Sequence, residues 1–226
     1  MGFSAQPLPE KGRTHVTSAW AEIATILGVF ALAIASPGPN FLLVLNRTIG
    51  DSRKSGLFTA LGVATGSGIF AFVGFMGLIL ILSTLPHFHI VIRILGGSYL
   101  AWLGFGMLYR LFTSRGEQSI DPQVEPMHIS PLHAYRSGLI TNLTNPKAWA
   151  FYLSLFALVV SPTIPLLSKM MLILAMFLIS FFWYATIAIL LSHNRIRPFF
   201  LRWQFLIQGG IGLLLIWLGG SFLLLR

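Results

Sequence analysis

Hydrophobic residues occur in six long runs that are separated by polar connections. Roughly 20 mostly apolar residues are needed for a helix to cross the hydrocarbon core of a bilayer, and each run is long enough. The pattern therefore predicts an all-α integral membrane protein with six transmembrane helices. The predicted helices cover approximately residues 20–45, 57–82, 90–111, 134–160, 166–192 and 205–225.

The polar segments indicate how the chain is organised. Residues 1–19 are polar, so we predict an N-terminal tail there, followed by a single membrane domain at 20–226. The polar stretch 113–133 lies near the middle of the chain and holds three prolines and three acidic residues. It divides the membrane domain into halves of about 20–112 and 134–226.

The first hydrophobic run has a second interpretation. A short basic lead and an apolar stretch that ends in Ala33-Ile34-Ala35 also fit a cleavable signal peptide. However, hydrophobic residues resume directly after Pro37-Gly38-Pro39, and another run of spanning length follows soon after. This continuity favours a helix that is retained in the membrane.

Composition narrows the class of protein and its partners. The 226 residues are 55% hydrophobic and only 9% charged, with a mean hydropathy of +0.80, whereas soluble domains carry about 25% charged residues. The net charge of +9 comes from Lys and Arg in the connections, where they suit anionic lipid headgroups better than a nucleic-acid groove. We expect membrane lipid as a partner and no nucleic acid, while a homo-oligomer stays open.

Lys and Arg are unevenly distributed between the two sides of the predicted bundle. The connections on one side carry nine of them, and those on the other side carry five. Because cytoplasmic connections are enriched in Lys and Arg, the first side should face the cytoplasm. Both termini should then lie outside.

The two halves share a pattern in their third runs. One reads GGSYLAWLGFGMLYR from Gly96, and the other reads GGIGLLLIWLGGSFLLLR from Gly209. Both hold a Gly-Gly pair, then Trp-Leu-Gly, then a closing Arg. With three runs in each half, the second half would insert upside down relative to the first. The sequence therefore predicts two inverted three-helix repeats.

Proline interrupts the first run of each half. The interruptions read Ser-Pro-Gly-Pro-Asn at 36–40 and Asn-Leu-Thr-Asn-Pro-Lys at 142–147. Proline removes a backbone donor and clashes with the carbonyl four residues back, so the helices should break there. Such breaks persist in hydrocarbon only where they are buried in protein or line a polar cavity, and paired breaks in inverted halves point to a transporter's central site. The alternative is that these prolines only kink two helices for packing.

The breaks carry the residues that we predict to bind a substrate. Half-helix ends expose N–H groups and carbonyls that can bind a carboxylate and an ammonium, and Asn side chains both donate and accept. Lys147 could bind a carboxylate, carry a proton if burial favours its neutral form, or extend to the membrane surface. The predicted substrate-binding residues are Pro37, Gly38, Pro39, Asn40, Asn142, Asn145, Pro146 and Lys147.

Other chemistry is not indicated by the sequence. It contains no Gly-x-Ser-x-Gly motif, phosphate-binding loop or dinucleotide motif, so we expect neither an enzyme nor a cofactor. The lack of Cys, and the position of every His in a tail or connection, argue against a metal site, the pair His87 and His89 included. Glu22 starts the first run, where it is an interfacial charge or a proton carrier.

Four stretches together resemble the LysE/RhtB amino acid exporters. They are SPGPN at 36–40, RKSG at 53–56, GGSYLAWLG at 96–104 and GLITNLTNPKA at 138–148. The resemblance runs from about residue 30 to the C-terminus, and the polar segment before Trp20 is longer than is usual in the family. The FYLSLF run that follows, and the basic connection near Arg195, are most similar to the threonine-exporting branch.

The resemblance implies a six-helix exporter in the bacterial inner membrane, driven by proton antiport and centred on the two breaks. Threonine or homoserine is the substrate that this branch favours. From the residues alone, two alternatives stay open. One is a membrane-embedded structural or assembly partner, and the other is efflux of another small metabolite or a metal ion.

Overall fold

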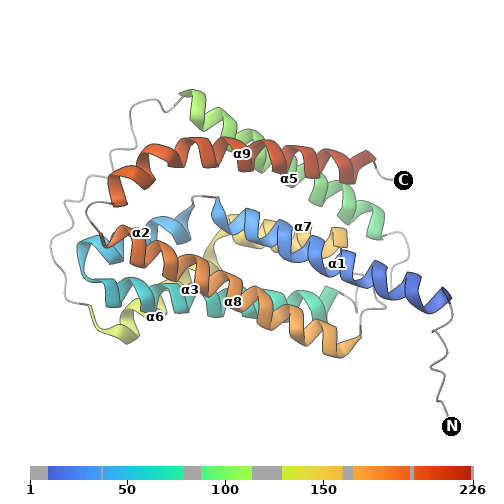
Figure 1. The fold of residues 1–226 in the computed structure, drawn as a ribbon, viewed down its shortest axis with the longest axis horizontal. Coiled ribbons are helices and arrows are strands. Elements are labelled where there is room, and N and C mark those ends of the chain that lie inside the picture. Colours follow the sequence, from blue (N-terminus) through green and yellow to red (C-terminus); the bar gives the residue numbers. More distant parts are fainter. Residues whose placement is uncertain are drawn as a thin grey trace, which may run out of the picture.

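The computed structural model describes residues 10–36, 38–78, 88–113, 129–159, 165–193 and 196–224. Over these ranges the regular structure is all helical, as predicted, and the helices run side by side along the long axis (Figure 1). They are α1 (Glu10–Ala35), α2 (Pro39–Gly50), α3 (Arg53–Val73) with a π-helical end (Gly74–Leu78), α5 (Phe88–Thr113), α6 (Pro131–Thr144), α7 (Pro146–Val159), α8 (Leu166–Leu191) and α9 (Ile196–Leu224).

The first helix begins earlier than predicted. We expected a polar tail at 1–19 and a helix from Trp20, but α1 begins at Glu10. No proline lies between Pro9 and Pro37, so no residue in that interval is unable to continue a helix. Residues 1–9 lie outside the described ranges, and so does most of the polar stretch predicted at 113–133.

Several of the helices have the length and composition of membrane spans. Among the described residues, Arg53–Gly77 and Leu166–Leu191 are each long and apolar enough to cross a bilayer. The helices Ile23–Ala35 and Pro39–Gly50 form a third candidate span together, bent by 54° at the break between them. These helices indicate an integral membrane protein.

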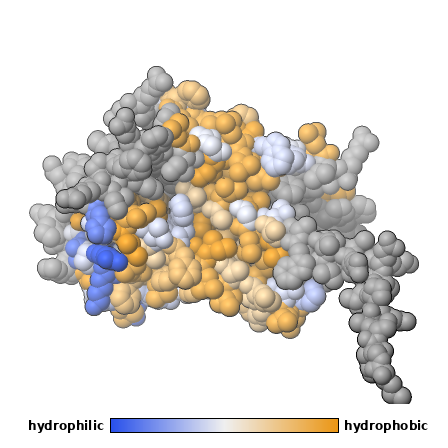
Figure 2. Space-filling view, in the orientation of Figure 1, coloured by the Kyte–Doolittle hydropathy of each residue, from blue (hydrophilic) through white to orange (hydrophobic). Residues whose placement is uncertain are grey.

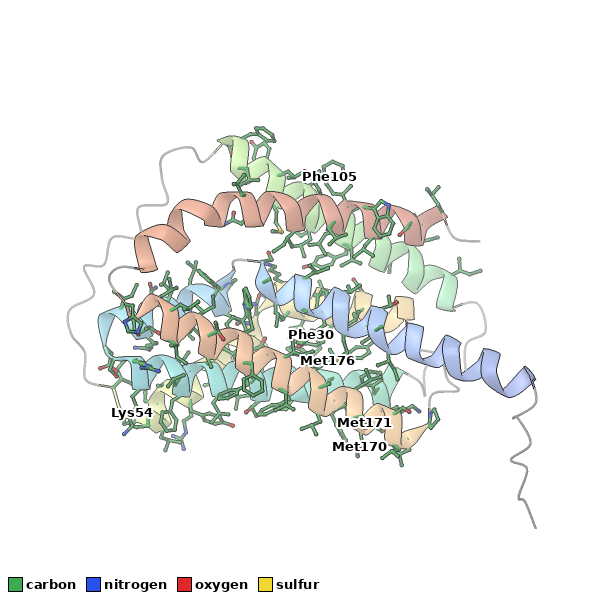
Figure 3. All side chains as sticks on the ribbon, viewed as in Figure 1. Phe30, Lys54, Phe105, Met170, Met171 and Met176 are labelled. Carbon is green, nitrogen blue, oxygen red and sulfur yellow. The ribbon has the colours of Figure 1, made fainter. Side chains whose placement is uncertain are left out.

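Large apolar side chains lie on the outside of the bundle as well as inside it. Phe30 and Met176 are completely buried, whereas Phe105 is 60% exposed and points away from α5 (Figure 3). Figure 2 shows hydrophobic residues over the middle of the visible face, with hydrophilic residues gathered at one end. Lys54 lies at the same end in Figure 3. An apolar exterior of this extent suits contact with lipid rather than water.

Glycines bring α3 and α6 close together. A Cβ atom at Gly62 would collide with the backbone carbonyl of Tyr135, and one at Gly138 would collide with the carbonyl of Thr59. Small residues allow membrane helices to approach to this distance. The approach places the α3 backbone at Val63 against the side chain of Asn142 on α6.

A second set of glycines joins α5 to α9, which form the upper layer in Figure 1. Gly97 lies against the carbonyl of Gly219, and Gly104 lies against the carbonyl of Gly212. The contacts are reciprocal, because a Cβ on either α9 glycine would likewise approach the carbonyl of its α5 partner. The two helices therefore pack antiparallel with their backbones close together.

Candidate functional site

The two predicted breaks occur, and the structure places them together in the interior of the bundle (Figure 1). One separates α1 from α2, which begins at Pro39, and the other separates α6 from α7, which begins at Pro146. The residue before each proline is extended, with φ −169° and ψ −170° at Gly38 and φ −71° and ψ 109° at Asn145. Proline forces its predecessor out of the helical region, so the sequence itself creates both breaks.

Two side-chain hydrogen bonds connect the breaks to each other. Asn40 Nδ2 donates to Asn142 Oδ1 at 3.0 Å, across 102 positions of sequence. Lys147 Nζ donates to Ser36 Oγ at 2.7 Å, across 111 positions. The tertiary structure thus assembles one site from two distant segments.

Asn142 is the centre of a buried polar network. Its Nδ2 donates to the carbonyl of Val63 at 2.6 Å and lies 3.2 Å from Ser67 Oγ. Ser67 Oγ is in turn 3.0 Å from Ser180 Oγ on α8. Asn142 is only 1% exposed, and with Asn40 the network links α2, α3, α6 and α8. A buried amide that bonds through both its oxygen and its nitrogen fixes the positions of these helices.

The Lys147 ammonium lies at the C-terminal end of α1. Besides the Ser36 hydroxyl, the Ser36 carbonyl accepts from Nζ at 3.5 Å. A helix C-terminus carries partial negative charge, which stabilises a cation. The described residues that line the adjoining cavity include neither Asp nor Glu. Among the described residues, a helix end and a hydroxyl lie against this charge.

Asn145 organises the start of α7. Its Oδ1 accepts from the Lys147 backbone N–H at 3.0 Å, which is the hydrogen bond of an N-cap residue. Its carbonyl accepts from the Trp149 backbone N–H at 3.1 Å. Trp149 Nε1 also donates to the carbonyl of Leu143 at 2.7 Å, near the end of α6. The second break is therefore held by side chains that satisfy its exposed backbone groups.

We expect Asn145→Ala to lower the free energy of unfolding by about 1 kcal/mol, the usual value of an N-cap side chain. At this chain length the loss corresponds to a fall of about 3 °C in Tm, measurable by thermal unfolding in detergent. Thr144→Ala is the matched control, because the Thr144 hydroxyl is exposed and bonds only to Ile140 of its own helix. Equal destabilisation by the two substitutions would contradict the capping role.

A small cavity of about 40 Å³ lies between the breaks, with both polar and apolar residues in its wall. Two polar atoms at its wall, Asn40 Oδ1 and the Tyr152 hydroxyl, are buried without a close hydrogen bond among the described residues, although Tyr184 interacts with Asn40 and Ser67 interacts with Tyr152. Buried polar atoms normally have partners, so both atoms can form closer hydrogen bonds to a bound molecule or to water. The lining residues are Ala33, Ile34, Ser36, Gly38, Asn40, Phe41, Ser67, Leu103, Asn142, Asn145, Lys147, Ala148, Phe151, Tyr152 and Tyr184.

A larger cleft of about 510 Å³ adjoins the small cavity. Four residues line both spaces: Gly38, Leu103, Asn145 and Lys147. The cleft is otherwise lined mainly by α5, with Tyr99 and Met107 among its residues. Tyr99 lies close to the break, since its hydroxyl donates to the Lys147 carbonyl at 3.3 Å. The shared residues form the boundary between the two spaces.

Most of the residues predicted to bind a substrate lie at these spaces. Five of them line the small cavity: Gly38, Asn40, Asn142, Asn145 and Lys147. Pro39 and Pro146 line the cleft. Pro37 lies outside the described residues.

The structure also adds residues that the sequence did not single out. Ser36 belongs to the predicted break, but only the folded chain shows it next to Lys147. Ser67, Tyr152 and Tyr184 reach the cavity from α3, α7 and α8. Polar side chains in membrane helices are a signal that could have pointed to them, but their sequence positions do not say which ones face one another.

Comparison with known proteins decides the family. Residues 31–226 match the model of the LysE type translocators. The chain belongs to this family. The matched residues contain both breaks and the side chains of the site, so the cavity is a feature of the translocator part of this LysE-type chain.

Relatives named for amino acid efflux resemble this LysE-type chain over most of its length. It is 30% identical over 190 residues to the threonine efflux proteins of Salmonella typhi and Escherichia coli, covering 84% of this chain and 91% of each relative. It is 37% identical over 130 residues to the leucine efflux protein of Salmonella choleraesuis, covering 57% of this chain and 58% of the relative. No solved structure matches.

Proposed function

We propose that this protein exports small neutral amino acids across the bacterial inner membrane, with threonine or homoserine as the preferred substrate, in exchange for protons. The observation that carries the proposal is the buried cavity at which two broken helices meet. The relatives named for threonine efflux and leucine efflux support the substrate class.

The chemistry of the cavity suits a zwitterion. An amino acid needs donors for its carboxylate and acceptors for its ammonium. Helices α2 and α7 begin at the cavity, where first-turn N–H groups lack acceptors within their own helix and carry partial positive charge. Helix α1 ends there, and the Ser36 carbonyl that follows it already accepts from the cationic side chain of Lys147. Asn40 Oδ1 adds a buried acceptor.

Transport requires the site to change shape. A cavity of about 40 Å³ holds a few water molecules and is too small for threonine. The adjoining cleft of about 510 Å³ falls within the usual range of small-molecule sites, about 300–1,000 Å³. We propose that the four residues between the two spaces move during alternating access, so that the site opens to one side of the membrane at a time.

Two inverted repeats would provide this movement. We propose a single transport domain at 20–226 with six spans, in which α1–α2, α3 and α5 correspond to α6–α7, α8 and α9. The reciprocal glycine contacts support this arrangement: Gly97 meets Gly219, and Gly104 meets Gly212. In the aligned Trp-Leu-Gly motifs, Gly97 corresponds to Gly212 and Gly104 to Gly219. A twofold axis produces such reciprocal pairing.

The distribution of basic residues supports an orientation. With nine Lys and Arg in one set of connections and five in the other, we propose that the α2–α3, α5–α6 and α8–α9 connections face the cytoplasm. Both termini then lie outside, on one side of the membrane, and in Figure 1 α1 begins and α9 ends at the same end of the bundle.

Counterflow in proteoliposomes tests the proposed function. Vesicles that contain the purified protein and unlabelled threonine should take up labelled threonine, and homoserine, serine and leucine should compete to different degrees. Empty vesicles provide the background. Collapse of the proton gradient should abolish accumulation against a concentration gradient, while counterflow continues. Absence of counterflow with all four amino acids would rule out the proposed substrate class.

A further inference from the structure

The Lys147 ammonium occupies a place that suits the ammonium of a substrate. We infer that these two ammonium groups bind in turn to one subsite, formed by the Ser36 hydroxyl and the carbonyl end of α1, and that their mutual exclusion couples proton movement to export. The inference rests on the proposed function. It specifies how the inward movement of protons is linked to the outward movement of amino acids.

The geometry of the subsite matches an ammonium group. Lys147 Nζ donates to Ser36 Oγ at 2.7 Å and to the Ser36 carbonyl at 3.5 Å. The α-ammonium of an amino acid has the same charge and the same three donors. Gly38 leaves room beside it, since a Cβ atom there would lie 3.3 Å from Lys147 Nζ. A substrate whose carboxylate meets the helix N-termini would present its ammonium to the same helix end.

The two ammonium groups cannot occupy the subsite together. Lys147 Nζ already bonds to both oxygens of the subsite, Ser36 Oγ and the Ser36 carbonyl. Like charges also repel strongly where water is excluded. Lys147 lines both the cavity and the larger cleft. Its flexible four-carbon stem can therefore turn toward the cleft when a substrate arrives.

The described residues that line the two spaces offer Lys147 no carboxylate to which it could pass its proton. The titratable groups that face the site are tyrosines: Tyr99 from α5, Tyr152 from α7 and Tyr184 from α8. The other elements present Ser36 at the end of α1, Asn40 on α2, Asn142 on α6 and Ser67 on α3. Among the described lining residues there is no Asp, Glu or His. The Nζ–H bond therefore breaks with transfer of the proton to water.

The resulting cycle balances in protons and charge. On the cytoplasmic side the substrate displaces Lys147, which releases one proton to cytoplasmic water, and the loaded protein then opens outward. After the substrate leaves, Lys147 takes a proton from outside water, binds Ser36 again and returns inward with its charge. One proton enters for each amino acid exported. The return step moves one positive charge inward, so an inside-negative potential accelerates it.

Lys147→Met tests the coupling, because it keeps the length of the side chain and removes its ionisable group. We expect complete loss of accumulation driven by a proton gradient, together with counterflow that remains measurable above the empty-vesicle background. Lys169→Met is the matched control: this lysine lies on α8 away from both spaces, and the variant should remain coupled. Proton-driven accumulation that persists in Lys147→Met would overturn the inference while the proposed function stands.

Loss of counterflow in a folded Lys147→Met variant would also overturn the inference of a shared subsite. Lys147 would then be a ligand of the substrate and not its competitor. Size-exclusion profiles and thermal unfolding in detergent establish that the variant is folded. Absence of counterflow in the wild-type protein would instead rule out the proposed function itself. The three results are distinguishable in one set of vesicles.

A binding measurement on the wild-type protein tests whether the substrate and Lys147 share the subsite, even if Lys147→Met does not fold. Addition of threonine to the detergent-solubilised protein in weak buffer should release about one proton per bound substrate, the stoichiometry expected for mutually exclusive ligands. A pH-indicator dye reports the release. Threonine binding without proton release would exclude the shared subsite.

Discussion

We expect Asn142→Ala to insert into the membrane but to export threonine about 30-fold more slowly than the wild-type protein. A change of about 30-fold corresponds to a free-energy difference of about 2 kcal/mol. The substitution removes the three hydrogen bonds that Asn142 makes with Asn40, Val63 and Ser67. Side-chain hydrogen bonds in membrane helices are worth about 0.6 kcal/mol each on average, which gives about 2 kcal/mol. Initial rates of counterflow at saturating threonine, for equal amounts of reconstituted protein, measure the effect.

Two further substitutions make the Asn142 result specific. Asn46→Ala is the matched control, because Asn46 lies exposed on α2, and its export should remain at the wild-type rate. Asn142→Asp keeps an oxygen that can accept from Asn40 but cannot donate to the Val63 carbonyl when ionised. We expect it to be as impaired as the alanine variant. A fully active Asn142→Asp variant would show that the site does not require the amide nitrogen of Asn142.

Gly62→Ala should destabilise the protein by about 3 kcal/mol, at the upper end of the cost of overpacking. The added Cβ would collide with the backbone carbonyl of Tyr135 and lie 2.8 Å from the Leu139 nitrogen. Both obstacles are backbone atoms of α6, so no side-chain rotation relieves them and the helices must separate. At this size the loss corresponds to about 10 °C in Tm, measured by thermal unfolding in detergent.

Export should fall together with stability in Gly62→Ala, because the bond from Asn142 to the Val63 carbonyl is formed one residue further along α3. Gly68→Ala is the matched control on the same helix. A Cβ atom there would meet only Phe177 at 3.7 Å, an ordinary contact. If both variants melt at the same temperature, close approach of α3 and α6 is not what requires glycine at position 62.

Local rules account for the positions of the breaks. The residues before Pro39 and Pro146 are extended because proline excludes them from the helical region, and this restriction acts between neighbours in the chain. A second local rule, which takes polar residues to indicate a tail, failed at the start of α1. Polarity led us to expect a tail up to residue 19, but α1 begins at Glu10. Polar residues do not by themselves end a helix, whereas proline does.

The hydrogen-bond partners across the site could not be predicted from the sequence. Asn40 pairs with Asn142, and Lys147 pairs with Ser36, over separations of more than one hundred residues. Such pairs depend on how far each helix is rotated and shifted against its neighbours. These quantities are set by packing, for example by the glycines that let α3 approach α6.

The sequence by itself determined the hydrophobic helices, the two proline breaks and most of the side chains that lie at them, because hydropathy and backbone restriction act locally. Only the tertiary structure decided that the breaks enclose one cavity, that Ser36 and the α1 end face the Lys147 ammonium, and that Asn142 joins four helices. The physical reason is that hydrogen bonds and charge interactions act over a few ångströms in space, whatever the distance along the chain.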